Sequence, residues 1–408
     1  MAEGHDWSVR ITEAQALFEQ EFGQREGLVA VVSPGRTEIA GNHTDHEGGH
    51  VIAGALDVAV VGVAAPNGTN VINVASEGFS PVAVAFDPAD PASLSPREDE
   101  RVTTAGLVRG MAALLAERGR VPAGFDLAMT SDIPSGGGLS SSAAVECALG
   151  RAMEALWEGP AGAEAIGAAD LARLAQRCEN DWFGKPCGLM DQMSVAQGAV
   201  CFMDFHESEA RIQRIEFDFA AHGYDICLVD VGCDHSRFTD EYAAVPVEMQ
   251  AVARELGATR LSDVAEEDFE AAVPALRTKL GDRAILRAAH YYLEESLVDQ
   301  RRDALLADDV ETFLALTRRS GMSSGMFLQN VSTAGAYQPA MLALGVAELA
   351  LAGRGAVRIH GGGFGGTIQA FVPHDLTANF VGRMDAALGA GSTRVYGISE
   401  EGARAWQL

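Results

Sequence analysis

The chain has 408 residues, of which 48% are apolar, so it is long enough for two domains around large cores. Its formal net charge of −27 argues against nucleic acid or an anionic membrane as a general partner. Because no apolar run approaches the ~20 residues of a membrane span and the first residues lack an apolar secretion signal, the six cysteines are expected as free thiols in a reducing cytoplasm.

The first half of the chain alternates apolar runs with Gly, Asn and Pro turns, which is typical of a sheet. The expected strands are Leu28–Val32, Val51–Ala65, Val71–Ala75, Val82–Phe86 and Phe125–Thr130. Apolar residues at helical spacing predict a helix over 101–118, and two more helices are expected over 142–157 and 164–179. Three further strands are expected near 199–205, 211–217 and 224–231.

The second half of the chain is richer in helices, which are expected over 240–256, 283–299, 302–320 and 334–352. Strands Ala356–His360 and Thr367–Val372 flank a glycine run, and a helix near 376–388 and a last strand, Arg394–Ile398, follow. Because neither half alternates strand and helix regularly, the sequence predicts an α+β fold with two domains, residues 1–210 and 211–408.

A loop rich in glycine and serine, Pro134–Ala143, lies between a predicted strand and a predicted helix. Glycines leave backbone N–H groups accessible, and the amino end of a helix attracts anions. The segment is therefore interpreted as a cradle for phosphate. The alternative is a flexible turn that is capped by a serine.

Three other patterns match known motifs but stand in the wrong local structure. The H-E-x-x-H match at 46–50 has two glycines where a zinc protease needs a helix, and the G-x-S-x-G match at 321–325 follows a predicted helix instead of a strand. The glycine run 361–366 precedes a strand, so it is interpreted as a turn between strands and not as a dinucleotide-binding fingerprint. The sequence also has no Walker A motif, so phosphoryl transfer would need another scaffold.

Four segments carry polar residues that a hydrophobic core does not explain: Ser33–Asp45, Pro134–Ala143, Glu179–Gln192 and Gly361–Gly366. Together and in this order they resemble the signatures of the galactokinases, a branch of the GHMP family of small-molecule kinases. The resemblance covers almost the whole chain and implies a two-domain GHMP-kinase fold. The N-terminal domain would be like ribosomal protein S5 domain 2, the C-terminal domain ferredoxin-like, and the active site would lie in the cleft between them.

The resemblance implies ATP-dependent phosphorylation of galactose at its anomeric C1 hydroxyl, giving galactose 1-phosphate. Asp191 would be the general base that takes the proton of the attacking hydroxyl. Arg36 would keep Asp191 ionised and stabilise charge on the transferred phosphoryl group. Without the other motifs, Asp191 would be read as a helix cap and Arg36 as part of a surface ion pair.

The resemblance also implies the residues that bind nucleotide and metal. ATP, the co-substrate, would bind the loop residues Gly136, Gly137, Gly138, Leu139, Ser140, Ser141 and Ser142. Mg²⁺ would be held by Ser141 and Glu179, since it prefers hard oxygen ligands. The backbone of the third motif, Gly361, Gly362 and Gly363, would approach the substrate. The alternative for Glu179 is a solvent-facing residue at a helix end.

The residues expected to bind the sugar are Asn42, His43, Asp45, Gly188 and Tyr242. A carboxylate that accepts hydrogen bonds from two vicinal hydroxyls, as Asp45 would, distinguishes one sugar epimer from another. The alternatives are a hydrogen-bonded core histidine for His43 and a packing role on a helix for Tyr242.

The chain departs from the family pattern mainly on the sugar side. Galactokinases usually carry glutamate at the position of Asn42, Val-Asn at 37–38, polar and basic residues at 243–246, and often cysteine at 367. Asparagine keeps an acceptor but loses the charge. The alternatives are therefore a kinase of another sugar (an amino sugar, arabinose or a uronic acid), a non-catalytic sugar sensor, and a scaffold whose glycine runs are only turns.

The expected partners are a small sugar and ATP, and the expected assembly is a monomer or weak homo-oligomer.

Overall fold

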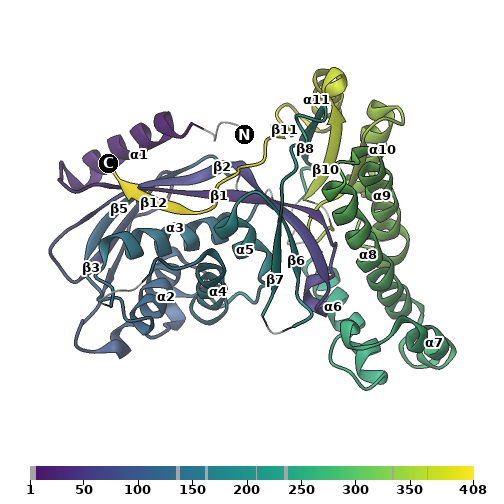
Figure 1. The fold of residues 1–408 in the computed structure, drawn as a ribbon, viewed down its shortest axis with the longest axis horizontal. Coiled ribbons are helices and arrows are strands. Elements are labelled where there is room, and N and C mark those ends of the chain that lie inside the picture. The colour runs from purple at the N-terminus through teal and green to yellow at the C-terminus, as the bar shows by residue number, and fades with distance from the viewer. Residues whose placement is uncertain are drawn as a thin grey trace.

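Two sheets form the frame of the molecule (Figure 1). The computed structural model describes residues 6–134, 138–160, 164–207, 209–233, 238–332, 335–364 and 366–408. Within these ranges the first sheet has eight strands and the second has four. The mixture of helix and sheet agrees with the α+β fold expected from the sequence.

The first sheet is built around two long strands, β1 (Val29–Ala40) and β2 (His50–Pro66). Its order is β12-β1-β2-β5-β3-β4, and β6 pairs with both β2 and β7. The remaining strands are β3 (Val71–Ser76), β4 (Val82–Ala85), β5 (Phe125–Ser131), β6 (Val200–Asp204), β7 (Arg211–Ile215) and β12 (Arg404–Gln407). Because β2 is so long, one of its ends pairs with β5 and the other with β6.

Alternate residues of β2 pack on opposite faces of the first sheet, as the period of a strand requires. Val61 and Val63 pack with Phe18 of α1 (Ser8–Phe22), whereas Val60 and Ala64 belong to the core on the other face. That face is covered by α2 (Thr104–Glu117), α3 (Ser141–Leu156), α4 (Ala168–Cys178) and α5 (Met190–Gln197). Figure 1 shows α1 on one side of the sheet and these four helices on the other.

The second sheet is antiparallel and has the order β11-β8-β10-β9. Its strands are β8 (Tyr224–Asp230), β9 (Ala356–Ile359), β10 (Thr367–Pro373) and β11 (Thr393–Tyr396). A helical insertion separates β8 from β9, β9 leads directly to β10, and α11 (His374–Leu388) separates β10 from β11. This is the strand–helix–strand–strand–helix–strand arrangement of a ferredoxin-like domain, which the family resemblance implied.

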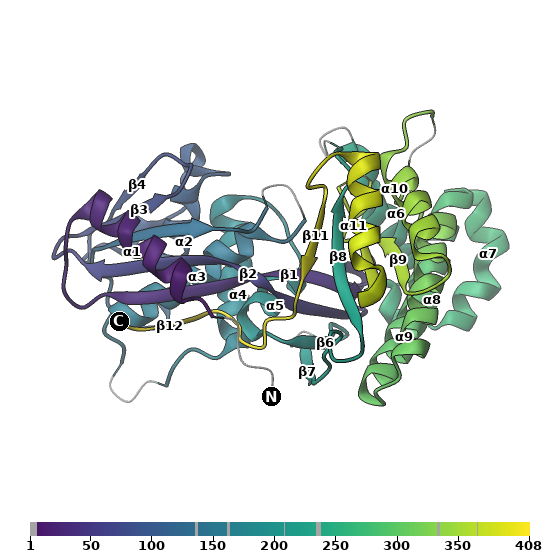
Figure 2. The same cartoon turned by 90° about the horizontal axis from the view of Figure 1, so that it is seen from above.

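Figure 2 shows the helices of the second half packed beside the second sheet. Besides α11 they are α6 (Thr239–Glu255), α7 (Glu266–Leu280), α8 (Asp282–Leu306), α9 (Val310–Ser323) and α10 (Pro339–Leu351). A shared core joins the halves, because Ile39 and Ile52 of the first sheet pack in one cluster with Phe313 and Phe371 of the second half. The two halves are therefore held together by a packed apolar core.

The structure corrects several predicted elements. The helices α1, α5 and α7 and the strand β12 were not predicted, and Pro274 inside α7 is one reason, since proline usually ends a helix. The predicted division between 283–299 and 302–320 is wrong, because α8 continues to Leu306. Arg301 permits this continuation, since it is fully buried and its guanidinium donates to Glu294.

The three patterns that were rejected from the sequence are also excluded by the fold. His46 lies in a short 3-10 turn and His50 opens β2, so the two histidines do not share a helix face. Gly321 lies within α9, and the described part of the 361–366 run links β9 to β10. The division at residue 210 stays a prediction, and the first sheet contains two strands that follow it in the chain, β7 and β12.

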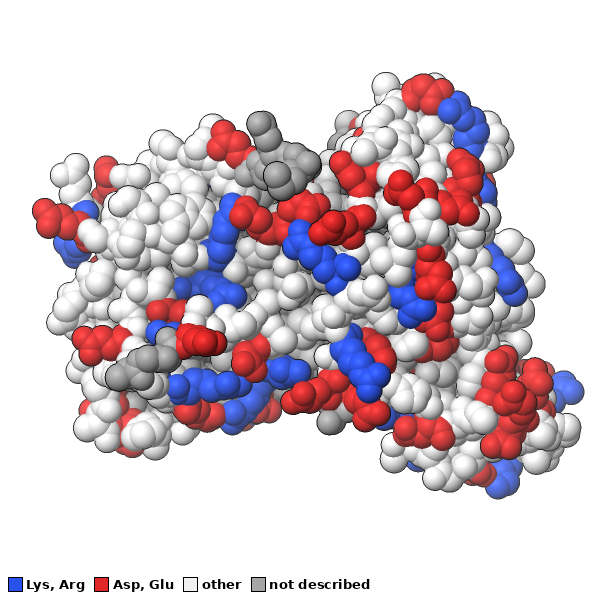
Figure 3. Space-filling view, viewed as in Figure 1, with Lys and Arg blue, Asp and Glu red and all other residues white. Residues whose placement is uncertain are grey.

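The surface carries acidic and basic side chains over most of the face in Figure 3, with an acidic cluster over α7. The first turn of that helix contains Glu266, Glu267 and Asp268. Within the described ranges, each helix is too short or too polar to cross a bilayer.

Candidate active site

A pocket of about 490 Å³ lies between the two halves and brings the four sequence motifs together. Its lining includes Arg36 of β1, Gly138 and Ser140 of the loop before α3, Asp191 of α5, Tyr242 of α6 and Gly363 of the turn between β9 and β10. Arg36 and Lys185 supply positive charge there, although the chain as a whole is acidic. A phosphate group in the pocket would therefore have two cationic side chains near it, beside the carboxylate of Asp191.

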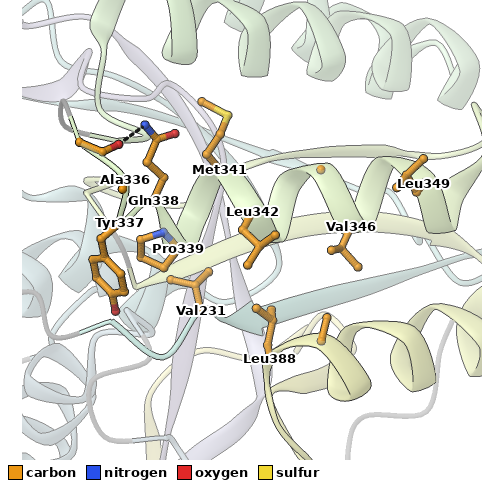
Figure 4. Close-up of a pocket in the computed structure, with 13 residues that line it drawn as sticks. Val231, Ala336, Tyr337, Gln338, Pro339, Met341, Leu342, Val346, Leu349 and Leu388 are labelled. Atoms are coloured by element: carbon orange, nitrogen blue, oxygen red, sulfur yellow. Dashed lines mark hydrogen bonds between the residues drawn. The ribbon is translucent and has the colours of Figure 1, made fainter.

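A larger groove, of about 940 Å³, lies between α10 and α11 and contains none of the motif residues (Figure 4). Leu342 and Val346 of α10 face Leu388 of α11 across it. Its lining is mostly apolar, and its polar side chains, Tyr337 and Gln338, carry no charge that would hold a phosphate. The smaller pocket is therefore the candidate active site.

Arg36 and Asp191 form an ion pair in this pocket. The Nε of Arg36 donates to Asp191 Oδ1 at 2.7 Å, and its Nη1 donates to the carbonyl of Gly138. The Ser140 hydroxyl donates to the other oxygen of Asp191. Burial raises the pKa of Asp191, but the charge and hydrogen bond of Arg36 and the bond from Ser140 outweigh it, so the pKa lies below 3.8. The carboxylate of Asp191 is therefore ionised, and the hydrogen bonds from Arg36 and Ser140 to its two oxygens fix its orientation.

The backbone of β1 brings Arg36 close to the loop. The pairing of β1 with β2 shifts register between Pro34 and Arg36, so the strand has a bulge immediately before Arg36. The Arg36 N–H donates to the carbonyl of Leu139 at 3.2 Å. Gly35 allows this approach, because a side chain there would start 3.3 Å from the same carbonyl.

The described part of the glycine–serine loop ends at the amino end of α3. Gly138 and Ser140 have φ values of 69° and 57°, and Ser140 is unusual in this region because it is not glycine. Its hydroxyl donates to Asp191, so the side chain of Ser140 does not cap the first N–H groups of α3. Gly136 and Gly137, also expected to bind ATP, lie outside the described residues.

Glu179 lies in a cluster of oxygen and nitrogen groups behind the loop. It is buried and accepts hydrogen bonds from Ser142 Oγ at 3.0 Å, from Gln192 Nε2 at 2.7 Å and from Lys185 Nζ at 3.4 Å. The hydroxyl on Glu179 is thus that of Ser142, whereas Ser141 is exposed at the start of α3. The structure therefore brings Glu179 to Ser142 and leaves Ser141 on the open side.

The sequence interpretation missed a second carboxylate near this cluster. Glu146 is fully buried, accepts a bond from Gln192 at 3.2 Å, and has an oxygen, Oε1, without a hydrogen-bond partner among the described residues. Burial and the neighbouring charge of Glu179 raise the pKa of Glu146. Its position one helical turn after Ser142 is the signal that could have placed both side chains on one face of α3. In the part of the chain that the structure describes, no three His, Cys, Asp or Glu side chains form a metal-binding group by themselves.

Four of the five predicted sugar-binding residues lie around the pocket or beside it. A side chain at Gly188 would start 2.5 Å from Asp45 Oδ2, so the glycine leaves the Asp45 carboxylate open. The His43 ring lies 5.6 Å from the ring of Tyr242 and its Nε2 lies 3.0 Å from the carbonyl of Gly362. Burial and the nearby His46 lower the pKa of His43 to about 3, so the ring is neutral.

Asn42, the fifth of these residues, is directed into the protein. Its Nδ2 donates to Glu38 at 3.2 Å and to the carbonyl of Gly361, and its Oδ1 accepts from Asn330 at 2.7 Å and Ser324 at 3.2 Å. The side chain is fully buried. Asn42 therefore ties β1 to the glycine turn instead of lining the pocket.

The glycine turn after β9 approaches both Tyr242 and Asn330 closely. A side chain at Gly362 would start 2.1 Å from the ring of Tyr242, and one at Gly363 would start 2.2 Å from the carbonyl of Asn330. Gly363 also has a φ of 78°. Only glycine fits this turn, so its backbone and the tyrosine ring share one wall of the pocket.

Comparisons with known proteins show the family to which the chain is similar. The model described as GHMP kinases N terminal domain matches residues 106–199, and the galactokinase galactose-binding signature matches residues 16–66. A galactokinase from Actinobacillus pleuropneumoniae serotype 5b is 31% identical over 367 residues, which cover 88% of this chain and 90% of the relative. A galactokinase from Limosilactobacillus fermentum is 27% identical and covers 90% of this chain and 91% of its own.

The fold is similar to that of a crystal structure of Lactococcus lactis galactokinase complexed with galactose. The TM-score is 0.81 at 23% sequence identity, and the match covers 98% of this chain and 100% of that one. The similarity in sequence extends over both sheets and includes the segment of Arg36, His43 and Asp45. This chain therefore belongs to the galactokinase family of the GHMP kinases.

Proposed function

We propose that this protein phosphorylates galactose at its C1 hydroxyl with ATP, with Asp191 as general base and Arg36 as the stabilising cation. The observation that carries the proposal is the Arg36–Asp191 pair, which lies in one pocket with Gly138 and the start of α3. The galactose-binding signature over residues 16–66 and the galactokinase relatives support the choice of sugar.

In the reaction, the C1 oxygen of the sugar forms a bond to the γ-phosphorus as the bond to the β,γ-bridging oxygen breaks. ADP leaves, and the proton of the hydroxyl passes to the carboxylate of Asp191. The lowered pKa makes Asp191 a weak base, so proton transfer occurs late, when the hydroxyl oxygen is already bonding to phosphorus. The main role of Asp191 is then to orient the nucleophile.

Arg36 contributes by charge and by position. Its guanidinium holds one oxygen of Asp191 and the carbonyl of Gly138, so it lies between the base and the loop that binds phosphate. A fixed cation at that point stabilises the negative charge that spreads over the transferred phosphoryl oxygens. The N–H groups at the start of α3 and the backbone of Gly138 would hold the phosphates of ATP.

Mg²⁺ fits the cluster behind the loop, because Glu179, Ser142 and the unpartnered oxygen of Glu146 offer hard oxygen atoms near one another. We infer that Glu179 and a loop serine hold it. When bound, the ion neutralises charge on the β- and γ-phosphates of ATP. The residues of this chain do the rest: Gln192 orients both carboxylates and Lys185 adds charge beside Glu179.

On the sugar side, Asp45 would accept hydrogen bonds from two neighbouring hydroxyls, with His43, Gly188 and Tyr242 around the ring. Asn42 is hydrogen-bonded within the protein at both ends of its amide. This favours a second candidate, a kinase of a sugar that differs from galactose at the hydroxymethyl end, such as arabinose or a uronic acid.

The test is ADP release by the purified protein with Mg·ATP and a panel of galactose, an amino sugar, arabinose and a uronic acid. The highest kcat/KM on galactose supports the proposal. A higher value on another sugar would leave a kinase with a different substrate, and sugar binding without turnover would identify a sensor.

We further infer a cytoplasmic location, because all six cysteines are free thiols.

A further inference from the structure

His360 precedes the glycine turn and lies where the two sheets meet, yet the mechanism above gives it no role. The residue follows β9 and is 4% exposed. Its Nε2 is 3.1 Å from the backbone nitrogen of Glu38 and 3.0 Å from Thr37 Oγ1, so the imidazole of the second half contacts β1 of the first. Both contacts fall on the two residues that follow Arg36.

The contacts determine which ring nitrogen of His360 carries the proton. A backbone N–H can only donate, so Nε2 must accept the bond from Glu38. Thr37 Oγ1 accepts from Gln369 Nε2 at 2.7 Å, so its own proton shares the lone pair of His360 Nε2 with the N–H of Glu38. Burial lowers the pKa of His360 well below 6.5, and the charges of Arg36 and Arg358 lower it further. The ring is therefore neutral, with its proton on Nδ1.

The hydrogen bond from Glu38 is needed because β1 has an open edge at this point. The neighbouring strand β12 pairs only with Val29–Val32, and the register with β2 shifts again between Glu38 and Ala40. Along the open edge, the N–H of Arg36 donates to Leu139 of the loop and the N–H of Glu38 donates to His360. The strand is thus held at Arg36 by the loop of the first half and two residues later by His360 of the second half.

The other side of the same ring faces the loop that holds phosphate. A side chain at Gly138 would start 3.7 Å from His360 Nδ1, which is van der Waals distance. Gly138 is also the residue whose carbonyl accepts from Arg36 Nη1. The same imidazole therefore contacts the strand that carries Arg36 and lies beside the residue whose carbonyl accepts from the Arg36 guanidinium.

We propose that His360 is a positioning residue for Arg36: its Nε2 anchors the strand after Arg36 and so sets how the guanidinium meets Asp191 and the transferred phosphoryl group. This inference rests on the proposed phosphoryl transfer, because it assigns His360 a part in the geometry of that step. Small displacements of a stabilising cation reduce the rate of the chemical step more than they reduce the binding of the substrate.

The experiment compares His360→Gln with His360→Asn. A glutamine places its carbonyl oxygen near the position of Nε2 and can still accept from Glu38, whereas asparagine is one bond shorter and cannot. We expect His360→Asn to lower kcat about 10- to 100-fold with less than about a 3-fold change in the KM of the sugar. His360→Gln should keep kcat within about 5-fold of the parent protein. Circular dichroism and thermal melting check that both variants fold.

Equal kcat values for the two variants, or a His360→Asn variant as fast as the parent, would overturn the inference. A drop in melting temperature with kcat unchanged per folded molecule would show a purely structural role and would also overturn it. If His360→Asn does not fold, His360→Ser, which lacks the ring and its acceptor, is measured instead with the same expectation.

The outcome is separable from that of the proposed function. If the parent protein turns over another sugar better than galactose, the same comparison is made on that sugar. If it turns over none, phosphoryl transfer fails as a function, and a crystal structure of His360→Asn decides the inference. Arg36 Nε displaced from Asp191 Oδ1 supports the positioning role, and an unchanged distance near 2.7 Å rejects it.

Discussion

Two arginine–carboxylate pairs lie two residues apart on β1, and their surroundings shift the carboxylates in opposite directions. Arg36 pairs with Asp191 of α5, and Glu38 pairs with Arg358 of β9. The Asp191 side chain is 30% exposed and that of Glu38 is 5% exposed. The pKa of Asp191 lies below its usual value, whereas burial raises the pKa of Glu38 although Arg358, Asn42 and Arg36 all act against it.

The comparison shows that a paired arginine alone does not determine the state of a carboxylate. Asp191 keeps contact with the pocket and gains the bond from Ser140, so its charge is stabilised where a substrate would meet it. Glu38 lies in the junction between the halves, where desolvation opposes its charge. The first pair is placed for chemistry, and the second holds β1 to β9.

The largest effect is expected at the pair that lines the pocket, from Asp191→Asn. The amide keeps the shape but cannot take the proton of the sugar hydroxyl, so kcat should fall about 10²- to 10⁴-fold. The KM of ATP should change little, because the loop before α3 is untouched. Steady-state ADP release measures both values, with Asp99→Asn as an exposed control outside the pocket. Unchanged turnover would exclude Asp191 as the base.

The buried pair should matter for stability instead. Arg358→Met leaves Glu38 in the junction without its cation, which should lower the free energy of unfolding by about 3–5 kcal/mol. The double variant Glu38→Gln/Arg358→Met should recover much of that loss, because no lone charge remains buried. Urea unfolding of the two single variants and the double variant measures the coupling. If the double variant is as unstable as the sum of the single ones, the pair does not interact as described.

A third charged cluster extends the comparison to pH. His50 of β2 contacts Glu295 and Asp299 of α8 at 3.0 Å and Asp204 at 3.5 Å. Burial lowers the pKa of His50, but the bonds and charges of Asp299 and Glu295 raise it to about 10. The stabilisation is therefore fully present below pH 6.5 and is lost as the pH rises through 10.

The variant His50→Gln tests this pH dependence. Over the range from pH 6.5 to 10, the parent protein should lose stability relative to the variant by an amount on the order of a few kcal/mol. Urea unfolding at several pH values, with the variant subtracted, removes the titration of other groups. Parallel curves for parent and variant would contradict the raised pKa.

The smallest effect is expected at the metal cluster. Ser142→Ala removes the hydrogen bond to Glu179, worth about 0.5–1.5 kcal/mol, so the Mg²⁺ concentration for half-maximal activity should rise about 3- to 10-fold. Ser141→Ala is the matched control, since the sequence assigned the metal to that serine. Magnesium titrations of ADP release compare the two. A larger effect of Ser141→Ala would support Ser141 as the metal ligand, as the sequence analysis expects.

Local patterns in the sequence were sufficient for the parts of the protein that depend on neighbours along the chain. Apolar periodicity located most strands of both sheets and several of the helices, and the glycine run before Thr367 was correctly predicted as a turn between strands. The order of the four motifs indicated the family. The short elements α5 and β12 were not predicted from the sequence, because each is stabilised mainly by its contacts with distant elements.

Only the tertiary structure decided the partners of individual side chains. Asn42 belongs to the sugar motif by sequence but bonds to Asn330 and Gly361, and Glu179 is reached by Ser142 instead of Ser141. Arg36 and Asp191 are 155 residues apart, and Glu38 and Arg358 are 320 apart. The sequence determined which groups the chain contains and the local turns that carry them. Which groups meet depends on the register of β1 against β2 and on how the second sheet docks, because a shift of one residue turns a side chain to the opposite face.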